Sequence, residues 1–159
     1  MDLVMFIGLQ GAGKTSFFRA RFALTHVHVS KDLYPRSARN KGERQAREIE
    51  AALAEGRSVV VDNTNPTRVE RAELVALAHR YGARRVGYYF QSVLADCLER
   101  NEQRAGRARI PDVGLYSTSK LLELPSFAEG FDELFYVQLG ERQEFHVSPW
   151  RETDEARDA

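Results

Sequence analysis

The chain has 159 residues, a length that fits one domain with its own hydrophobic core. Its 23 basic and 23 acidic side chains cancel, so no global field attracts nucleic acid or a membrane, and any basic surface must be local. One cysteine excludes an internal disulfide, and no apolar run is long enough for a signal peptide or a membrane span, so we expect a cytoplasmic protein that does not bind membranes.

A phosphate-binding loop follows the first predicted strand, the apolar run LVMFI at residues 3–7. Residues 8–15 read GLQGAGKT, a complete G-x-x-x-x-G-K-[ST] pattern, and a helix is predicted from Lys14 to about Ala23. A strand before the glycines and a helix after them is the arrangement in which backbone N–H groups converge on a polyphosphate. The segment therefore predicts binding of a nucleoside triphosphate; a plain glycine-rich turn is the alternative.

The residues of this loop have distinct expected roles. Its glycines permit backbone conformations that a Cβ would block, and the N–H groups from Gly11 to Thr15 form an anion-binding nest. Lys14 places its charge against the β- and γ-phosphates, and the hydroxyl of Thr15 is an expected Mg²⁺ ligand. The expected nucleotide-binding residues are Gly8, Gly11, Ala12, Gly13, Lys14, Thr15 and Ser16.

The second predicted strand, at residues 27–29, leads to an acidic residue inside a basic segment. Asp32 could deprotonate an acceptor hydroxyl in line with the γ-phosphate, or it could be a helix cap or a surface acid. Residues 31–47 carry a net charge of +4, which suits an acceptor that bears phosphate, either a nucleic acid or a small metabolite.

A third strand is predicted at residues 58–62, after a helix over residues 39–55. The sequence VVVD that ends at Asp62 is a Walker B pattern, in which an apolar strand delivers a carboxylate beside Mg²⁺; a structural role is the alternative. Asn63 and Asn65 follow, and their amides either shape the turn or contact the substrate.

The remaining predicted elements include an arginine-rich lid. Arg100, Arg104 and Arg107 are spaced i, i+4, i+7 on one helix face, and the stretch from residue 100 to 109 has a net charge of +3. A lid over about residues 100–112 would bring these cations to the transferred phosphoryl group; a solvated arginine face is the alternative. Cys97 in the same helix reads as a small buried hydrophobe. The predicted elements of this part are helices at 67–81, 93–104 and 112–122, and strands at 86–90 and 133–139.

Five strands alternating with helices predict an α/β fold. We expect a P-loop NTPase with a five-stranded parallel sheet, helices on both faces and an adenylate-kinase-like lid. In such sheets ligands bind beyond the carboxyl ends of the strands. The expected kinase domain covers residues 1–147, and residues 148–159 form a polar, frayed tail.

Five segments together resemble the kinase domain of the polynucleotide kinases, both the bacteriophage enzyme and the mammalian kinase-phosphatase. The segments are GLQGAGKTS at 8–16, VHVSKD at 27–32, VVVDNTNPT at 59–67, ERNEQR at 99–104, and LLELPSFAEGFDELFYV at 121–137. The last contains the family's P-x-x-x-EGF closing pattern, here Pro125, Glu129, Gly130 and Phe131.

This resemblance implies roles for single residues. Asp32 matches the family's general base, and Arg100 and Arg104 match two arginines that contact ATP phosphates. The phage enzyme places an acceptor-binding arginine three residues after its base, where this chain has Pro35; Arg36 is the next position and the expected counterpart.

The expected function is that of an Mg²⁺-dependent kinase. ATP or another NTP is the expected donor, and the 5′-hydroxyl end of DNA or RNA is the expected acceptor. A small-molecule kinase of the same architecture and a nucleotide-switched binding module are the alternatives. The expected catalytic residues are Lys14, Asp32, Arg100 and Arg104; the substrate-binding residues are Asp32, Arg36, Asn63 and Asn65; the metal ligands are Thr15 and Asp62.

Overall fold

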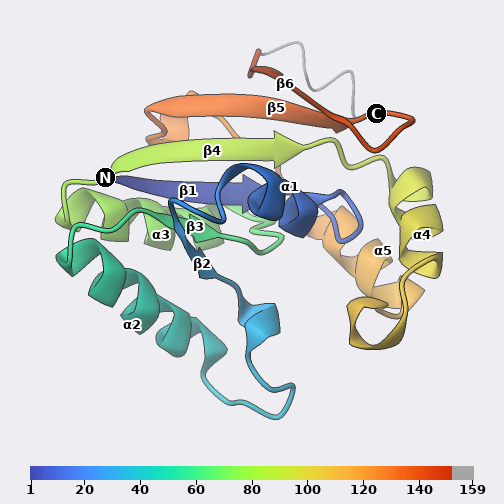
Figure 1. Ribbon diagram of the computed structural model, residues 1–159, viewed down its shortest axis with the longest axis horizontal. Helices are drawn as coiled ribbons and strands as arrows, with labels where there is room; N and C mark the ends of the chain where they lie inside the picture. The colour runs from blue at the N-terminus through green and yellow to red at the C-terminus, as the bar shows by residue number, and fades with distance from the viewer. Residues whose placement is uncertain (152–159) are drawn as a thin grey trace.

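The computed structural model describes residues 1–151 and contains one central sheet (Figure 1). The strands lie in the order β2-β3-β1-β4-β5-β6, and the first five in this order are mutually parallel. This arrangement confirms the predicted α/β class with its parallel sheet. The strands are β1 (Asp2–Ile7), β2 (Val27–Val29), β3 (Val59–Val61), β4 (Arg84–Phe90), β5 (Glu133–Leu139) and β6 (Phe145–Pro149).

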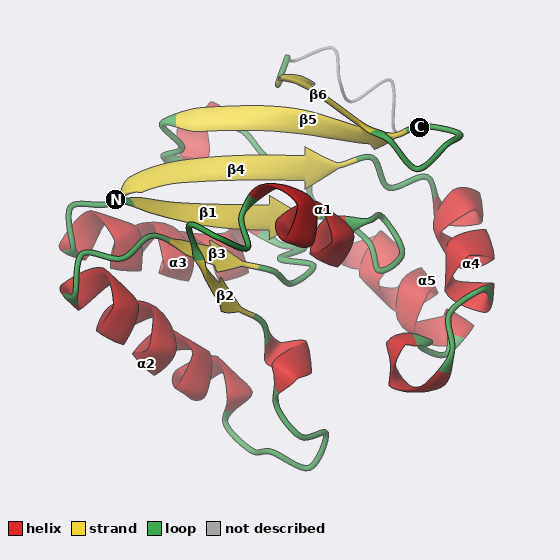
Figure 2. Ribbon diagram, in the orientation of Figure 1, coloured by secondary structure: helices red, strands yellow, loops and turns green. Residues whose placement is uncertain are grey.

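Five α-helices connect or flank the strands, and three short 3₁₀ turns lie between them (Figure 2). The helices are α1 (Lys14–Arg21), α2 (Lys41–Ala54), α3 (Arg68–Arg80), α4 (Leu94–Glu102) and α5 (Asp112–Leu121). The 3₁₀ turns are Lys31–Leu33, Gly106–Ala108 and Phe127–Glu129. Within residues 1–151, no helix is long and apolar enough to cross a membrane.

The two faces of the sheet carry separate hydrophobic clusters, because successive side chains of a strand point to opposite faces. On β1, Leu3, Met5 and Ile7 belong to one cluster, while Val4 and Phe6 belong to the other. Side chains of α2 and α3 pack in the first cluster, and side chains of α1, α4 and α5 pack in the second. Helices thus cover both faces, as predicted, which explains why β3 and residues 3–7 of β1 are apolar without alternation.

The sheet has one strand more than the sequence predicted. β6 runs antiparallel to β5, with Val147 opposite Val137. Trp150, which follows, is buried against Tyr89 and Tyr136. β6 escaped prediction because it is an edge strand that is mostly exposed and has little apolar content. Residues 148–150, expected at the start of a frayed tail, are therefore paired and packed, while 152–159 lie outside the described residues.

A buried ion pair joins the connection after β3 to the segment before β5. Arg71 is fully buried, and its Nε donates to Glu129 Oε1 over 2.8 Å. The same guanidinium donates to the main-chain oxygen of Asn65 at 2.9 Å. Glu129 and Phe131, both part of the P-x-x-x-EGF pattern, therefore have structural roles: the first holds Arg71, and the second packs in the core.

Candidate active site

The phosphate loop connects β1 to α1 at the carboxyl edge of the sheet, where β1 and β4 point toward α4 and α5 (Figure 1). Gly11 has a φ of +83°, and a Cβ there would lie 2.8 Å from the carbonyl oxygen of Cys97. Gly13 has a φ of +95° and is the N-cap of α1. Cys97 itself is fully buried, in line with its predicted role as a small hydrophobe. The loop is therefore packed against the backbone of α4, and only glycine fits at position 11.

The other residues of the loop divide between structural and accessible positions. The amide of Gly8 donates to the Thr64 carbonyl at 3.0 Å, and that of Ala12 donates to the Leu9 carbonyl at 3.2 Å, so both amides are used within the protein. Ser16 is exposed in the first turn of α1, where its hydroxyl can reach a bound ligand.

The Lys14 side chain folds back over the loop. Its Nζ donates to the carbonyl oxygens of Gly8 at 3.0 Å and Leu9 at 2.6 Å, and the residue is buried. Burial lowers the pKa of Lys14 to about 8, while the carboxylate of Asp62 opposes this shift. The ammonium group is thus held in an environment poor in compensating charge, which a polyphosphate would supply.

Asp62 lies directly after β3 and is shared by two donors. The hydroxyl of Thr15 donates to Asp62 Oδ2 at 2.8 Å, and His28 Nε2 lies 2.9 Å from the same oxygen. The His28 ring stacks on Phe18 of α1, with the ring centroids 4.0 Å apart. These contacts fix the orientation of a carboxylate that is only 3% exposed.

The chemistry of this pair fits Mg²⁺. A hydroxyl and a carboxylate are hard oxygen donors, and Mg²⁺ in kinases is held by one or two protein ligands together with substrate phosphates. Thr15 and Asp62 are the residues that would hold the ion. When bound, it would neutralise charge on the phosphates.

Asp32 is exposed and lies in the 3₁₀ turn after β2 (Figure 2). Its amide donates to the hydroxyl of Ser30 at 3.3 Å, so Ser30, rather than Asp32, caps this turn. The carboxylate is close enough to raise the pKa of Lys14, although burial, which lowers that pKa, dominates. Because Asp32 is exposed, its carboxylate is accessible to a substrate.

The two asparagines after β3 have structural contacts. Asn63 accepts from the Lys31 amide at 2.9 Å and donates to Gln45 at 2.6 Å, which fixes the segment that carries Asp32. Asn65 is 6% exposed, has a φ of +43°, and donates to the main-chain oxygen of Phe6 at 2.7 Å. These contacts favour the turn-shaping alternative for Asn65, because its amide nitrogen is used inside the protein.

The lid arginines point to different parts of the site. Arg100 donates to the carbonyl of Gly11 at 3.0 Å, so it lies against the phosphate loop. Arg104 donates to the main-chain oxygen of Ala108 at 3.2 Å, and its charge is one of several that act on the pKa of Lys14. Arg107 donates to the main-chain oxygen of Tyr34. Arg36 is exposed and faces the lid from the loop after β2.

The lid connection is closed at its base by one side chain. Asn101 is fully buried; its Nδ2 donates to the Ile110 carbonyl at 2.7 Å, and its Oδ1 accepts from the Ile110 amide at 3.1 Å. Residues 102–109 thus form a loop whose two ends are tied together.

Three residues of the site were not predicted from the sequence. His28 sits within a short strand, and only the alternation of side chains along β2 could have indicated that it faces α1. Tyr34 and Asn101 carry no catalytic signature. The contact of Tyr34 joins segments far apart in the chain, and that of Asn101 joins residues nine positions apart.

The chain is similar to several known proteins. The family model described as AAA domain matches residues 3–117. A protein of Acanthamoeba polyphaga mimivirus, named a bifunctional polynucleotide phosphatase/kinase, is 29% identical over 141 residues. The match covers 84% of this chain and 32% of the viral protein, so the chain spans about a third of that relative's length.

Solved structures share the fold. A complex of AvrRxo1-ORF1 and AvrRxo1-ORF2 with ATP has a TM-score of 0.73 at 14% identity, covering 99% of this chain and 62% of that one. A fungal RNA kinase has a TM-score of 0.68 at 15% identity, covering 88% of this chain and 39% of that one. The resemblance to polynucleotide kinases that the motifs indicated is confirmed by the viral relative. Since the family model covers well over half of its residues, the chain belongs to the AAA domain family, and it is similar to the viral protein named a polynucleotide phosphatase/kinase.

Proposed function

We propose that this P-loop kinase transfers the γ-phosphate of ATP or another NTP to the 5′-hydroxyl end of DNA or RNA in an Mg²⁺-dependent reaction. The observation that carries the proposal is the position of Asp32. Its exposed carboxylate lies in the turn after β2, which the Lys31 amide ties to Asn63 next to Asp62, on a segment with a net charge of +4. That is where an acceptor bearing phosphates would meet the donor.

On the donor side, the residues would bind the nucleotide and neutralise the charge of its phosphates. Lys14 and the loop amides would hold the β- and γ-phosphates, and the lid arginines Arg100 and Arg104 would stabilise the charge on the transferred group. Thr15 and Asp62 would organise Mg²⁺.

On the acceptor side, Asp32 would accept the proton of the attacking hydroxyl. The oxygen then bonds to the γ-phosphorus as the bond to the β-phosphate oxygen breaks, and the nucleoside diphosphate leaves. Arg36 would hold a phosphate of the acceptor.

The test is Asp32→Asn, which keeps the size of the side chain and removes the base. Transfer to a 5′-hydroxyl oligonucleotide should fall by about 10²–10⁴-fold, the usual contribution of a general base, while ATP binding measured by calorimetry stays unchanged. Glu73→Gln on the exposed face of α3 is the matched acid-to-amide control and should retain full activity.

Other outcomes contradict the proposal in separable ways. Full transfer by Asp32→Asn would remove Asp32 from the role of base. If the wild type transfers phosphate to a nucleoside or a sugar but not to oligonucleotides, the small-molecule alternative replaces the nucleic-acid acceptor. ATP hydrolysis with no acceptor at all supports the nucleotide-switched module.

A further inference from the structure

The cationic residues from Arg100 to Arg109 turn toward two different sides of the site. Arg100 bonds the phosphate loop, and Arg104 acts on the Lys14 ammonium. Arg107 instead reaches the main chain of Tyr34, on the loop that follows Asp32, and Arg109 lines a pocket on that same side.

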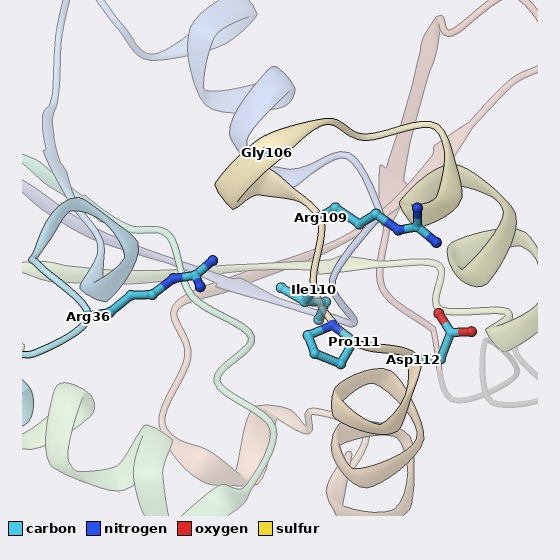
Figure 3. A pocket seen from close by; sticks show the side chains of 6 residues that line it. All are labelled: Arg36, Gly106, Arg109, Ile110, Pro111 and Asp112. Carbon is cyan, nitrogen blue, oxygen red and sulfur yellow. The ribbon is translucent and has the colours of Figure 1, made fainter.

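This pocket lies between the lid and the loop after β2, and we call it the lid pocket (Figure 3). Its volume is about 510 Å³, within the roughly 300–1,000 Å³ of small-molecule sites. Figure 3 shows Arg36 extending toward Ile110 and Pro111 from one side, while the lid segment that carries Arg109 forms the other. The lining residues are Arg36, Gly106, Arg109, Ile110, Pro111 and Asp112.

The charges of the lid pocket are not neutralised by the protein. Within residues 1–151, neither Arg36 nor Arg109 forms an ion pair with a carboxylate. Asp112 is the one acid among the lining residues and takes part in no ion pair in the same part of the chain. With two arginines and one aspartate among its lining residues, the pocket has a net positive charge, which favours an anion.

The walls of the lid pocket are held in place from both sides. On the loop side, the Tyr34 hydroxyl donates to Glu48 at 2.8 Å, and Arg44 lies 4.2 Å from the centre of its ring. On the lid side, both main-chain polar groups of Ile110 are bonded to Asn101. A pocket that is formed before binding costs a ligand less ordering.

The composition of the lid pocket matches one nucleotide unit. Arg36 and Arg109 offer planar donors that suit phosphate oxygens, and Ile110 with Pro111 offers an apolar surface for a sugar or a base. A purely apolar ligand would leave the guanidinium groups without partners, and a bare phosphate would leave most of the volume unused.

We infer that the lid pocket binds a nucleotide unit of the acceptor strand, with Arg36 and Arg109 on the phosphates at its two ends, so that one half of the lid holds the donor and the other half holds the acceptor. This inference rests on the proposed function. It assigns Arg109 to acceptor recognition and separates it from Arg100 and Arg104. Arg107 then links the two halves, because its contact with Tyr34 brings the lid onto the acceptor loop.

The experiment compares steady-state transfer to a short single-stranded 5′-hydroxyl oligonucleotide by the wild type, Arg109→Gln and Arg36→Gln. Arg57→Gln is the matched control, because Arg57 is exposed and precedes β3 at the opposite edge of the sheet. A second set of acceptors has one phosphodiester at a time, from the first to the third linkage, replaced by an uncharged methylphosphonate.

The substitutions are expected to change the KM for the oligonucleotide while leaving the KM for ATP almost unchanged. Arg109→Gln and Arg36→Gln should raise the KM for the oligonucleotide by about tenfold or more, as expected for the loss of a charged hydrogen bond, with the KM for ATP within about twofold of wild type. Methylphosphonate at one linkage should weaken the wild type by a similar factor and have little further effect on Arg109→Gln.

Two results would overturn the inference while leaving the proposed function intact: an unchanged oligonucleotide KM in Arg109→Gln, or a change in the KM for ATP instead. Equal sensitivity of wild type and variant to every methylphosphonate would do the same. A wild type that phosphorylates no oligonucleotide would overturn the proposed function, and the inference with it.

Discussion

At the scale of single residues, Lys14 has a strongly perturbed ionisation. Burial lowers its pKa from 10.5 to about 8, and the opposing effect of Asp62 is too small to restore it. The unfolded chain keeps its Lys14 proton to about pH 10.4. Between pH 8 and 10.5 the unfolded state therefore binds more protons than the folded state, so the stability of the free protein rises with pH in this window.

Lys14→Met should remove this pH dependence. Below pH 8 the wild type carries the full cost of burying the ammonium, so the variant should be more stable at pH 7 by up to about 3 kcal/mol, and the difference should vanish near pH 10.5. Urea denaturation of the nucleotide-free proteins at pH 7 and 10 measures it. Parallel stability curves for the two proteins would show that the ammonium is not destabilised in the free state.

The sequence predicted the chemistry of this site better than its contacts. The phosphate loop and the Walker B aspartate are local patterns, and the structure brings Thr15 and Asp62 within 2.8 Å. For Asn65 the sequence left a turn role and a substrate contact open, because it does not tell which amide is buried. His28 was not predicted as a site residue, because its role depends on contacts with Phe18 and Asp62, which are distant in sequence.

At the scale of secondary-structure elements, the ion pair between Arg71 of α3 and Glu129 holds the connection after β3 in place. Both side chains are buried or nearly so, and Arg71 also bonds the carbonyl of Asn65. The P-x-x-x-EGF pattern was found by family resemblance alone, because no periodicity of the sequence indicates an ion pair between residues 58 positions apart.

Glu129→Gln should destabilise the protein by about 3–5 kcal/mol, since it leaves the buried Arg71 without a counter-charge. Glu123→Gln is the control: Glu123 meets Arg68 at 3.9 Å, both side chains are about half exposed, and its loss should cost less than about 1 kcal/mol. Chemical denaturation compares the two variants. Equal small losses would mean that the pair does not hold the fold together.

At the scale of the whole molecule, the net charge is zero, so a charged ligand is attracted only by local groups of charged residues. The order of strands and helices was predictable, because apolar runs alternate with amphipathic stretches along the chain. β6 was not, because an exposed edge strand has neither signal. Because the whole molecule is neutral, the net charge of +4 in residues 31–47, near Asp32, acts without a long-range field from the rest of the surface.

Oligonucleotide binding should consequently depend only weakly on salt. Each phosphate contacted on a single strand contributes about −0.7 to the slope of log affinity against log salt concentration, so one or two contacts predict a slope of about −0.7 to −1.4. Fluorescence anisotropy across a potassium chloride series provides the slope. A much steeper value would mean that many more cations contact the strand.

The tight approach of Gly11 to Cys97 limits how the candidate active site can open. The backbones of the phosphate loop and α4 are in close contact. The helix therefore cannot move away as a rigid body without disrupting the phosphate loop. Asn101 is hydrogen-bonded to Ile110, so a movement of the lid would be confined to the residues between these two. The site would then open by movement of this short loop, with Asn101 as its hinge. Arg100 would stay in place with α4, and Arg104, Arg107 and Arg109 would move with the loop.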